Sequence, residues 1–385
     1  MIKVLTYPDI DPQQWQALED SSPYATWFQT KEAYEFYAAV GTELLPFAFG
    51  IEEYEGDGAS GIEEECKVES VKCKGEENGK ADTPASTPYT LHPKPTLKGV
   101  IVGYVTKERN ALKQFFTRRA IIYGGPLLAN DISDEALSAL LTSLTKLPSL
   151  QGGGGGRLTP IYIESRNFHD YSRWKEVFKK AGFAYQPHLN YHVDTTSLDQ
   201  VQSRIGKHRW RYIRLSMRDG AKIVQQPTIE QVRAFYTILQ DLYRTKVRTP
   251  LWSWEFFERL YHTEQARYIL VELDGQIVGG TACVCLPGKA VYEWYACGLD
   301  DCRDDIRPLS VAIWGEMQLA AENGYPLFDF MGAGTPDQPY GVRDFKSEFG
   351  GELVEHGRFL CVRKPLLYWI GKMGVKWLKR RINKQ

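Results

Sequence analysis

A chain of 385 residues is longer than one hydrophobic core usually organises, so we expect two domains. Hydrophobic residues make up 43% of the chain and aromatic residues 13%, which is typical of a globular protein and leaves enough side chains for two cores. The formal net charge of -1 excludes a protein that is basic all over, so any contact with nucleic acid or a membrane must come from local patches.

The seven cysteines are odd in number and form no paired CxxC units, which favours neither a secreted disulfide framework nor a zinc site. The N-terminus MIKVLTYPDIDPQQW lacks the basic and then apolar run of a signal peptide. No uninterrupted apolar stretch reaches about 18 residues. We therefore expect a reducing compartment, no metal ion, and a cytoplasmic location that includes the inner face of the membrane.

The first half of the chain alternates helical and extended patterns. Helices are predicted at 11–20, 31–40, from Ser133 onward with its hydroxyl as the cap, and at 171–181. Strands are predicted at 44–51, 97–105, 120–128, 161–164 and 188–194.

Two segments interrupt this pattern. Residues 52–97 carry eleven acids and five lysines and little to bury, so we expect a mobile excursion between two strands of one sheet. Five glycines at 152–156 indicate a flexible link. A phosphate cradle at these glycines is the sharper alternative, but no helix start or Lys-Ser/Thr pair follows them.

His188 and His192 have a spacing of four, which on a helix could bind a metal. They lie in an alternating segment after a proline, so we interpret the segment as a strand and expect no metal site.

The segment 197–220 is predicted to be one helix of five to six turns, with a capping box at its start and Asp219-Gly220 as its end. Five cations recur along it at spacings of three and four and form one stripe: Arg204, Lys207, Arg211, Arg214 and Arg218. A neighbouring stripe is expected to pack on the domain: Val201, Ile205, His208, Tyr212 and Leu215. Without acidic partners the cationic stripe suits phosphates, and a solvated helix face is the alternative.

The second half repeats the mixed pattern. Helices are predicted at 229–244, 254–262 and 308–322. Strands are predicted at 266–273, 276–286, 290–297 and 325–332, with Asp274-Gly275 as a hairpin turn.

The run GAGTPDQPYGVRDFKSEFGGE at 332–352 follows the last of these strands and is predicted to be a functional loop entering a short helix. Within it Arg343, Asp344 and Lys346 place two cations and a carboxylate on one turn, where an anionic reacting group could be held, and Tyr340 precedes them. A surface loop with a solvated ion pair is the alternative.

The order of FDFMGAG, a tyrosine-glycine pair and FKSEFGGELVEHGRF resembles the Fem family of peptidoglycan-bridge aminoacyltransferases and the wider FemAB-like acyltransferases built on the GNAT fold. Further matches are WFQTKEAYEFY at 27–37, IIYGGPLL at 121–128, KHRWRYIRLSMRDGAKIV at 207–224 and AVYEWYACG at 290–298. The resemblance implies an α/β (α+β) fold of two tandem GNAT-like domains with mixed central sheets. We expect them at 1–193 and 194–357, followed by a last strand and a basic amphipathic tail at 358–385.

The loop GLDDCRDDIRPL at 298–309 bears on the acyl donor. Acetyl-CoA-dependent members of the fold usually carry a glycine-containing run there whose amides bind pyrophosphate. Here the glycines are missing and two Asp-Asp pairs would repel it. The resemblance therefore implies aminoacyl-tRNA as the donor and no other cofactor, with acyl-CoA less favoured. The implied acceptor is an amine of a lipid-linked or nucleotide-linked peptidoglycan precursor.

The resemblance also implies roles for single residues. Lys346 would hold negative charge on the donor's terminal phosphate or the developing oxyanion, and Phe345 would shape the pocket. Trp294 and Tyr295 would contact the acceptor. The remaining substrate-binding candidates are the basic helix and the loop, with Arg211 and Arg214 assigned to the acceptor's diphosphate: Lys207, Arg211, Arg214, Tyr340 and Arg343.

Asp329 is a candidate general base, with the capping of a turn as the favoured alternative. In the 27–37 segment the family's lysine is replaced by Glu35 or Tyr37.

Two other functions stay open at this point. One is transfer from acyl-CoA or acyl carrier protein to a sugar amine of a surface polysaccharide, and the other is a catalytically silent scaffold that binds membrane precursors.

The tail from Arg363 holds eight Lys or Arg and no acid, with Leu366, Ile370, Met373 and Trp377 at helical spacing. It is expected to bind the anionic inner leaflet reversibly, and docking on the protein's own surface is the alternative.

Overall fold

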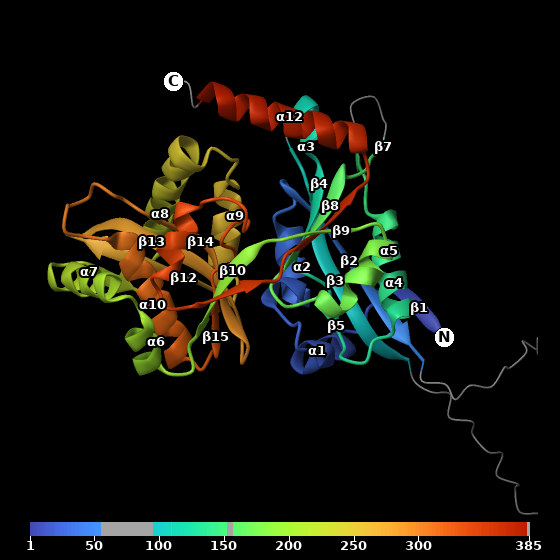
Figure 1. Ribbon diagram of the computed structural model, residues 1–385, viewed down its shortest axis with the longest axis horizontal. Helices are drawn as coiled ribbons and strands as arrows, with labels where there is room; N and C mark the ends of the chain where they lie inside the picture. The colour runs from blue at the N-terminus through green and yellow to red at the C-terminus, as the bar shows by residue number, and fades with distance from the viewer. Residues whose placement is uncertain (55–94, 109, 152–156, 383–385) are drawn as a thin grey trace, which may run out of the picture.

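The computed structural model describes residues 1–54, 95–108, 110–151 and 157–382. They form two lobes, each built around a mixed sheet (Figure 1). The first sheet contains β1 (Ile2–Thr6), β2 (Leu44–Glu53), β3 (Thr96–Thr106), β4 (Arg119–Gly124), β5 (Leu127–Leu128), β8 (Tyr162–Asn167), β9 (Ala184–Gln186) and β17 (Arg358–Val362). Its order is β1-β2-β3-β4-β8-β17-β9, and β5 also pairs with β3.

The second sheet contains β10 (Leu189–Asp194), β11 (Lys222–Val224), β12 (Ala266–Leu273), β13 (Gln276–Leu286), β14 (Ala290–Gly298), β15 (Leu327–Asp329) and β16 (Glu352–Glu355). Its order is β11-β12-β13-β14-β15-β10-β16. A separate hairpin joins β6 (Leu150–Gln151) to β7 (Arg157–Leu158).

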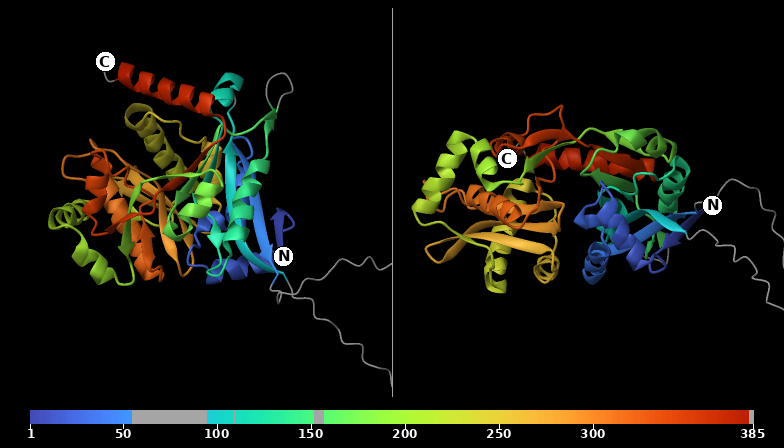
Figure 2. Two further views of the ribbon diagram at one scale, coloured as in Figure 1. Left: turned by 45° about the vertical axis from the view of Figure 1, so that its right-hand side comes forward. Right: turned by 90° about the horizontal axis from the view of Figure 1, so that it is seen from below.

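The helices of the first lobe are α1 (Pro12–Ser21), α2 (Lys31–Ala39), α3 (Ala111–Thr117), α4 (Asp134–Ser143) and α5 (Lys175–Lys180), with 3₁₀ turns at Trp27–Gln29, Leu144–Lys146 and Ser172–Trp174. Those of the second lobe are α6 (Leu198–Arg204), α7 (Lys207–Arg218), α8 (Ile229–Leu242), α9 (Trp254–Tyr261), α10 (Pro308–Glu322) and α11 (Gly341–Ser347), with a π turn at Tyr243–Val247. The last helix, α12 (Pro365–Ile382), packs against α3 and extends over the second lobe (Figure 2).

Most of the predicted elements are confirmed, and so is the cap at Ser133, whose hydroxyl accepts from the amide of Ala136 at 3.1 Å. The insert at 52–97 lies almost wholly outside the described residues, and the glycine link at 152–156 lies wholly outside them. The strands that flank the insert, β2 and β3, pair antiparallel in one sheet as expected.

The single helix predicted at 197–220 is wrong, because the chain forms α6 and α7 with a break at Ile205-Gly206. The amide of Gly206 donates to the carbonyl of Glu348 at 2.8 Å instead of continuing the helix, and Ser197 makes no capping hydrogen bond. The break shifts the buried side of α7 to Ile213 and Ser216. His208 and Tyr212, predicted to pack, are exposed.

The predicted domain boundary at 193 misassigns one strand. β10 pairs with β15 and β16 of the second sheet, and its Tyr191 and Val193 belong to the core of that domain. β17 then returns to the first sheet, where it lies between β8 and β9. The second domain is thus inserted into the first, and the chain crosses before β10 and again after β16.

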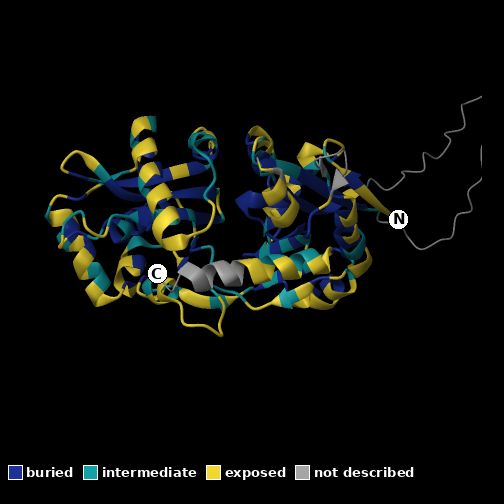
Figure 3. Ribbon diagram, turned by 90° about the horizontal axis from the view of Figure 1, so that it is seen from above, coloured by how far each residue is buried: buried dark blue, intermediate teal, exposed yellow. Residues whose placement is uncertain are grey.

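Aromatic side chains join the two domains. One hydrophobic cluster contains Trp27 and Phe36 of the first domain together with Phe256 and Tyr295 of the second. Seen from above, buried residues concentrate in the two sheets on either side of this junction (Figure 3). Within the described ranges, no helix has both the length and the apolar character needed to cross a membrane.

Candidate active site at the fork of the second sheet

The second sheet opens into a fork between β14 and β15. The two strands pair in parallel from Ala290 and Leu327 to Tyr292 and Asp329, and the pairing ends there. On its other side β14 pairs with β13 and carries a bulge. Ala282 pairs with Tyr295 and Cys283 pairs with Glu293, which leaves Trp294 without a partner on β13. A bulge leaves backbone groups of the extra residue unpaired and re-aims its side chain, as often happens beside active sites.

One pocket lies on the face of the fork that α10 covers, and we call it the α10 pocket. It has a volume of about 490 Å³ and is lined by the end of β14, the start of α10, Arg209 and Phe345. Arg209 donates to the Ser310 hydroxyl at 2.8 Å and to a carboxylate oxygen of Glu348 at 3.1 Å. Its guanidinium carbon lies 4.5 Å from the centre of the Phe345 ring. Phe345 therefore forms part of the pocket wall, as predicted. The sequence analysis did not select Arg209 as a site residue, because Arg209 lies outside the predicted cationic stripe.

Lys346 bridges the two arms of the fork. Its ammonium donates to the carbonyls of Phe330 at 2.7 Å and Gly332 at 3.1 Å, and lies 3.4 Å from Oε1 of Glu293. Its side chain is 12% exposed. Three acceptors match the three ammonium protons, so they hold Lys346 at the fork, and an incoming anion must displace one of them to accept a hydrogen bond from the lysine.

Two buried acids support Lys346. Burial raises the pKa of Glu293, and the attraction of Lys346 opposes that rise. Behind it Glu316 is fully buried, and burial together with the nearby Glu293 raises the pKa of Glu316 well above its ordinary value. The raised pKa favours the neutral form of Glu316, and Glu293 is the acid that pairs with the lysine.

A second cavity lies between the domains on the opposite face of the fork, and we call it the interdomain cavity. Its volume is about 110 Å³. Tyr123, Arg166 and Arg358 reach it from the first sheet, and His188, Asn190, Trp294 and Gly332 from the second domain. Trp294 also packs on Phe28 with ring centres 5.0 Å apart, so it forms part of the domain junction.

Asp329 is fully buried at the fork and accepts hydrogen bonds from Nδ2 of Asn190 at 2.6 Å and from the amide of Met331 at 2.5 Å. Nε2 of His192 lies 3.1 Å from its other oxygen. Burial alone would raise the pKa of Asp329, but His192 and Asn190 lower it. The amide of Met331 shows that Asp329 caps the turn, and a carboxylate with a lowered pKa is a poor proton acceptor, so the geometry favours the capped turn over the predicted general base.

His192 is the charged partner of Asp329 when its ring is protonated. Burial would lower the pKa of His192, but Asp329 raises it above the ordinary value. Burial lowers the pKa of His169 and of His188 to about 4, and it lowers that of His356 as well. His192 is on β10, within the strand that the sequence indicated, and His188 directly precedes β10. The signal that was missed is the alternation of the polar residues His188, Asn190 and His192.

The other predicted site residues fall into two groups. Arg343 donates to the carbonyls of Thr335 and Gln338 in its own loop, Tyr340 packs over Gly334, and Tyr295 is buried among aromatic rings. Lys207, Arg211 and Arg214 are exposed on α7, which packs against α10. They lie on the α10 face of the second sheet, and neither the α10 pocket nor the interdomain cavity includes them in its lining.

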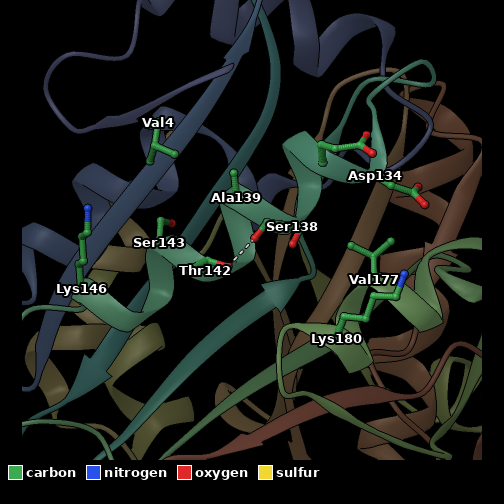
Figure 4. Close-up of a pocket in the computed structure, with 10 residues that line it drawn as sticks. Val4, Asp134, Ser138, Ala139, Thr142, Ser143, Lys146, Val177 and Lys180 are labelled. Carbon is green, nitrogen blue, oxygen red and sulfur yellow. Dashed lines mark hydrogen bonds between the residues drawn. The ribbon is translucent and has the colours of Figure 1, made fainter. Parts of the chain in front are cut away.

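An open groove of about 630 Å³ on the outer side of the first domain is lined by α4, Val4, Val177 and Lys180 (Figure 4). The Thr142 hydroxyl beside it donates to the carbonyl of Ser138 within α4. The groove lies at the edge of the molecule away from the fork (Figure 1). We assign no chemistry to it.

Comparison with known proteins agrees with this geometry. The profile of the family described as acetyltransferase (GNAT) domain matches residues 207–347, which include the fork and α10. Residues 207–347 thus carry a GNAT acyltransferase domain, and the chain as a whole has a FemX-like fold. The crystal structure of FemX aligns with 96% of this chain and 99% of its own at a TM-score of 0.61 and 14% identity. No curated protein matches the chain in sequence.

L-PGS from Bacillus licheniformis is also similar in structure, at a TM-score of 0.50 and 11% identity over 94% of this chain and 96% of its own. The C-terminal domain of a putative lysylphosphatidylglycerol synthetase from Agrobacterium fabrum covers 72% of this chain and 85% of its own, at 13% identity and a TM-score of 0.47. The FemAB-like GNAT fold predicted from the sequence is thus confirmed, together with its two tandem GNAT-like domains and mixed sheets.

Proposed function

We propose that this acyltransferase moves an aminoacyl group from aminoacyl-tRNA to an amine of a lipid-linked or nucleotide-linked peptidoglycan precursor. The observation that carries the proposal is the fork, which has a pocket on each face and Lys346 between its arms. An acyl transferase must bring an amine and an activated carbonyl together from separate binding sites. The choice of donor and acceptor follows from the resemblance of the sequence to the Fem family, and the chain shares the fold of FemX over both domains.

The α10 pocket suits the donor. Asp300 and Asp304 line it, and they would oppose the pyrophosphate of CoA. An aminoacyl ester on a terminal ribose needs no pyrophosphate site. The exposed cations of α7 lie on the same face of the sheet, so we now assign Lys207, Arg211 and Arg214 to the tRNA backbone instead of the acceptor's diphosphate.

The reaction joins the two sides of the fork. The acceptor amine attacks the ester carbonyl, a C–N bond forms, and the C–O bond to the ribose breaks. His192, in its neutral form, accepts the proton that the amine loses, and the departing ribose oxygen takes up a proton to become a hydroxyl. Lys346 lies where negative charge develops on the carbonyl oxygen.

The experiment that tests this function is mass spectrometry of peptidoglycan and surface glycans from a deletion strain. Peptide branches that lack their added amino acid support the proposal. Unchanged peptidoglycan with altered glycan acylation would contradict it and favour a sugar amine as acceptor. A purified-enzyme assay that compares aminoacyl-tRNA with acyl-CoA then decides the donor.

Replacing Arg211 and Arg214 by Gln is expected to weaken binding of aminoacyl-tRNA, because both side chains are exposed and without acidic neighbours in the predicted stripe. Each lost phosphate contact should reduce the slope of log binding constant against log salt by about 0.7–0.9. Filter binding across a salt series measures it, with Arg233→Gln on α8 as the control. An unchanged slope would show that the stripe is a solvated face.

A membrane surface is proposed where α3 meets α12. These helices expose a set of apolar side chains at one end of the first domain: Leu112, Phe115, Phe116, Leu366, Trp369, Ile370 and Met373. The segment from Arg363 adds eight cations and no acid. This combination suits an anionic leaflet, where a lipid-linked acceptor would reside.

The full chain is expected to sediment with vesicles that contain anionic lipid and to release at high salt, since each cation near the surface contributes about 1 kcal/mol. A chain that ends at Val362 should bind much more weakly, and neutral vesicles should bind neither chain. Equal sedimentation of both chains with anionic vesicles would rule out α12 as the anchor.

A further inference from the structure

Two arginines meet in the interdomain cavity and share one acid. Arg166 on β8 and Arg358 on β17 are direct partners in the strand register, so their side chains leave the same face of the sheet. Arg166 donates to Oε2 of Glu164 at 3.0 Å, and Arg358 donates to Oε1 at 2.9 Å. The three groups together carry one uncompensated positive charge.

The remaining partners of the arginines are neutral. Nη1 of Arg166 donates to the Tyr123 hydroxyl at 2.7 Å. Nη2 of Arg358 lies 2.9 Å from Nε2 of His188. Burial and Arg358 lower the pKa of His188 to about 4, so at pH 7 its ring is uncharged and accepts this bond. Asp329, another acid at this junction, is engaged by His192.

The rest of the lining is mostly apolar. Phe168, Leu189, Trp294 and Met331 contribute to it, and the other polar side chains, Asn167 and Asn190, are neutral, so no further anion balances the charge there. Burial and the neighbouring Arg166 lower the pKa of Arg358. Burial alone would raise the pKa of Glu164, but the two arginines lower it to about 2. The unbalanced positive charge of these three groups therefore destabilises the cavity, and a bound anion would remove that destabilisation.

The cavity can admit such an anion. A quarter of the Arg358 side chain remains accessible, and the value for Arg166 is 24%. The cavity volume of about 110 Å³ fits a carboxylate group and is small for a diphosphate. Planar guanidinium groups bind carboxylates through paired, charge-assisted hydrogen bonds.

We propose that Arg166 and Arg358 bind a carboxylate of the acceptor in the interdomain cavity and so orient its amine toward the fork. That the carboxylate belongs to an acceptor rests on the proposed function, whereas the anion site itself does not. Trp294 lines the cavity and also occupies the bulge of β14, so a molecule anchored by the arginines would approach the reacting carbonyl past this side chain.

Acetate is the probe. Thermal unfolding of the full chain is followed at pH 7 and constant ionic strength while acetate replaces chloride, with inorganic phosphate as a second series. At ten times its dissociation constant a bound anion raises the folded-to-unfolded ratio about elevenfold. We expect this gain in the wild type and in Arg218→Gln, an exposed arginine paired with Asp219, and its loss in Arg358→Gln.

Should Arg358→Gln fail to fold, Leu189→Phe fills the cavity and keeps every charge, and NMR titration of the His188 ring follows acetate in the wild type without any substitution. No gain from acetate over chloride, or an equal gain in all variants, would overturn the site. A larger gain from phosphate would overturn the carboxylate assignment. Acetate binding by a chain that shows no aminoacyl transfer would support the anion site and contradict the proposed function.

Discussion

Lys346→Ala is expected to lower aminoacyl transfer by about 10²- to 10³-fold, the usual effect of removing one electrostatic donor from a transition state. The structure adds a cost in stability. The substitution leaves Glu293 buried without its cation and two carbonyls without their donor. Loss of one partner of a buried pair costs about 3–5 kcal/mol, reduced here because Glu293 can take up a proton. Steady-state transfer and chemical denaturation measure the two effects.

A double variant separates them. Lys346→Met together with Glu293→Gln removes both charges, so it should recover much of the lost stability without restoring transfer. Recovery of transfer to more than about half the wild-type rate would show that Lys346 only holds the loop in place. Arg343→Gln, whose guanidinium binds carbonyls of its own loop, is the matched control for a lost cation nearby.

His192→Asn is expected to reduce transfer by about 10²- to 10⁴-fold, the range for loss of a general base. In the wild type the rate should rise with pH and level off above the raised pKa of His192, because only the neutral ring accepts a proton. The variant should lose this dependence. His356→Asn is the control, because the ring of His356 lies 5.1 Å from that of His192 and its loss removes a neighbouring histidine without removing the proposed base. A pH profile that is the same in His192→Asn and the wild type would exclude His192 as the base.

Stability should change in the opposite direction over the same pH range. The pKa of His192 is raised by folding, so its bond to Asp329 stabilises the protein fully below the unfolded value of about 6.5 and is lost as pH rises through the folded value. Asp329 has a lowered pKa, so its contribution holds above about 3.9 and is lost as pH falls through its folded value. As pH rises through the folded pKa of His192, the transfer rate should thus increase while the His192–Asp329 pair contributes less to the free energy of unfolding.

Local patterns account for what the sequence could predict. Capping residues, alternation of apolar residues and the glycine turns predicted most of the longer helices and strands, but not β1, β9, β11, β16 or α3. The motif FKSEFGGE selected Lys346 and Phe345, which the structure places at the fork. These signals are carried by neighbouring residues. The break at Gly206 could not be found in this way, because the carbonyl that takes its amide belongs to Glu348.

The interdomain cavity shows the same limit more clearly. Arg166, His188 and Arg358 are far apart in the sequence and have no motif in common. They meet because β8 and β17 are neighbours in the first sheet while β10 belongs to the second. Because the sequence analysis assigned β10 to the first domain, it predicted neither the interdomain cavity nor the correct domain boundary.

The return of β17 to the first sheet has a consequence for synthesis of the protein. β17 lies between β8 and β9, so β9 has no neighbour in its sheet until residues 358–362 have left the ribosome. During translation the second domain must emerge while the edge of the first is still open at β8. The wall of the interdomain cavity that Arg166 and Arg358 form is therefore among the last parts of the enzyme to be completed, after every residue of the fork has been made.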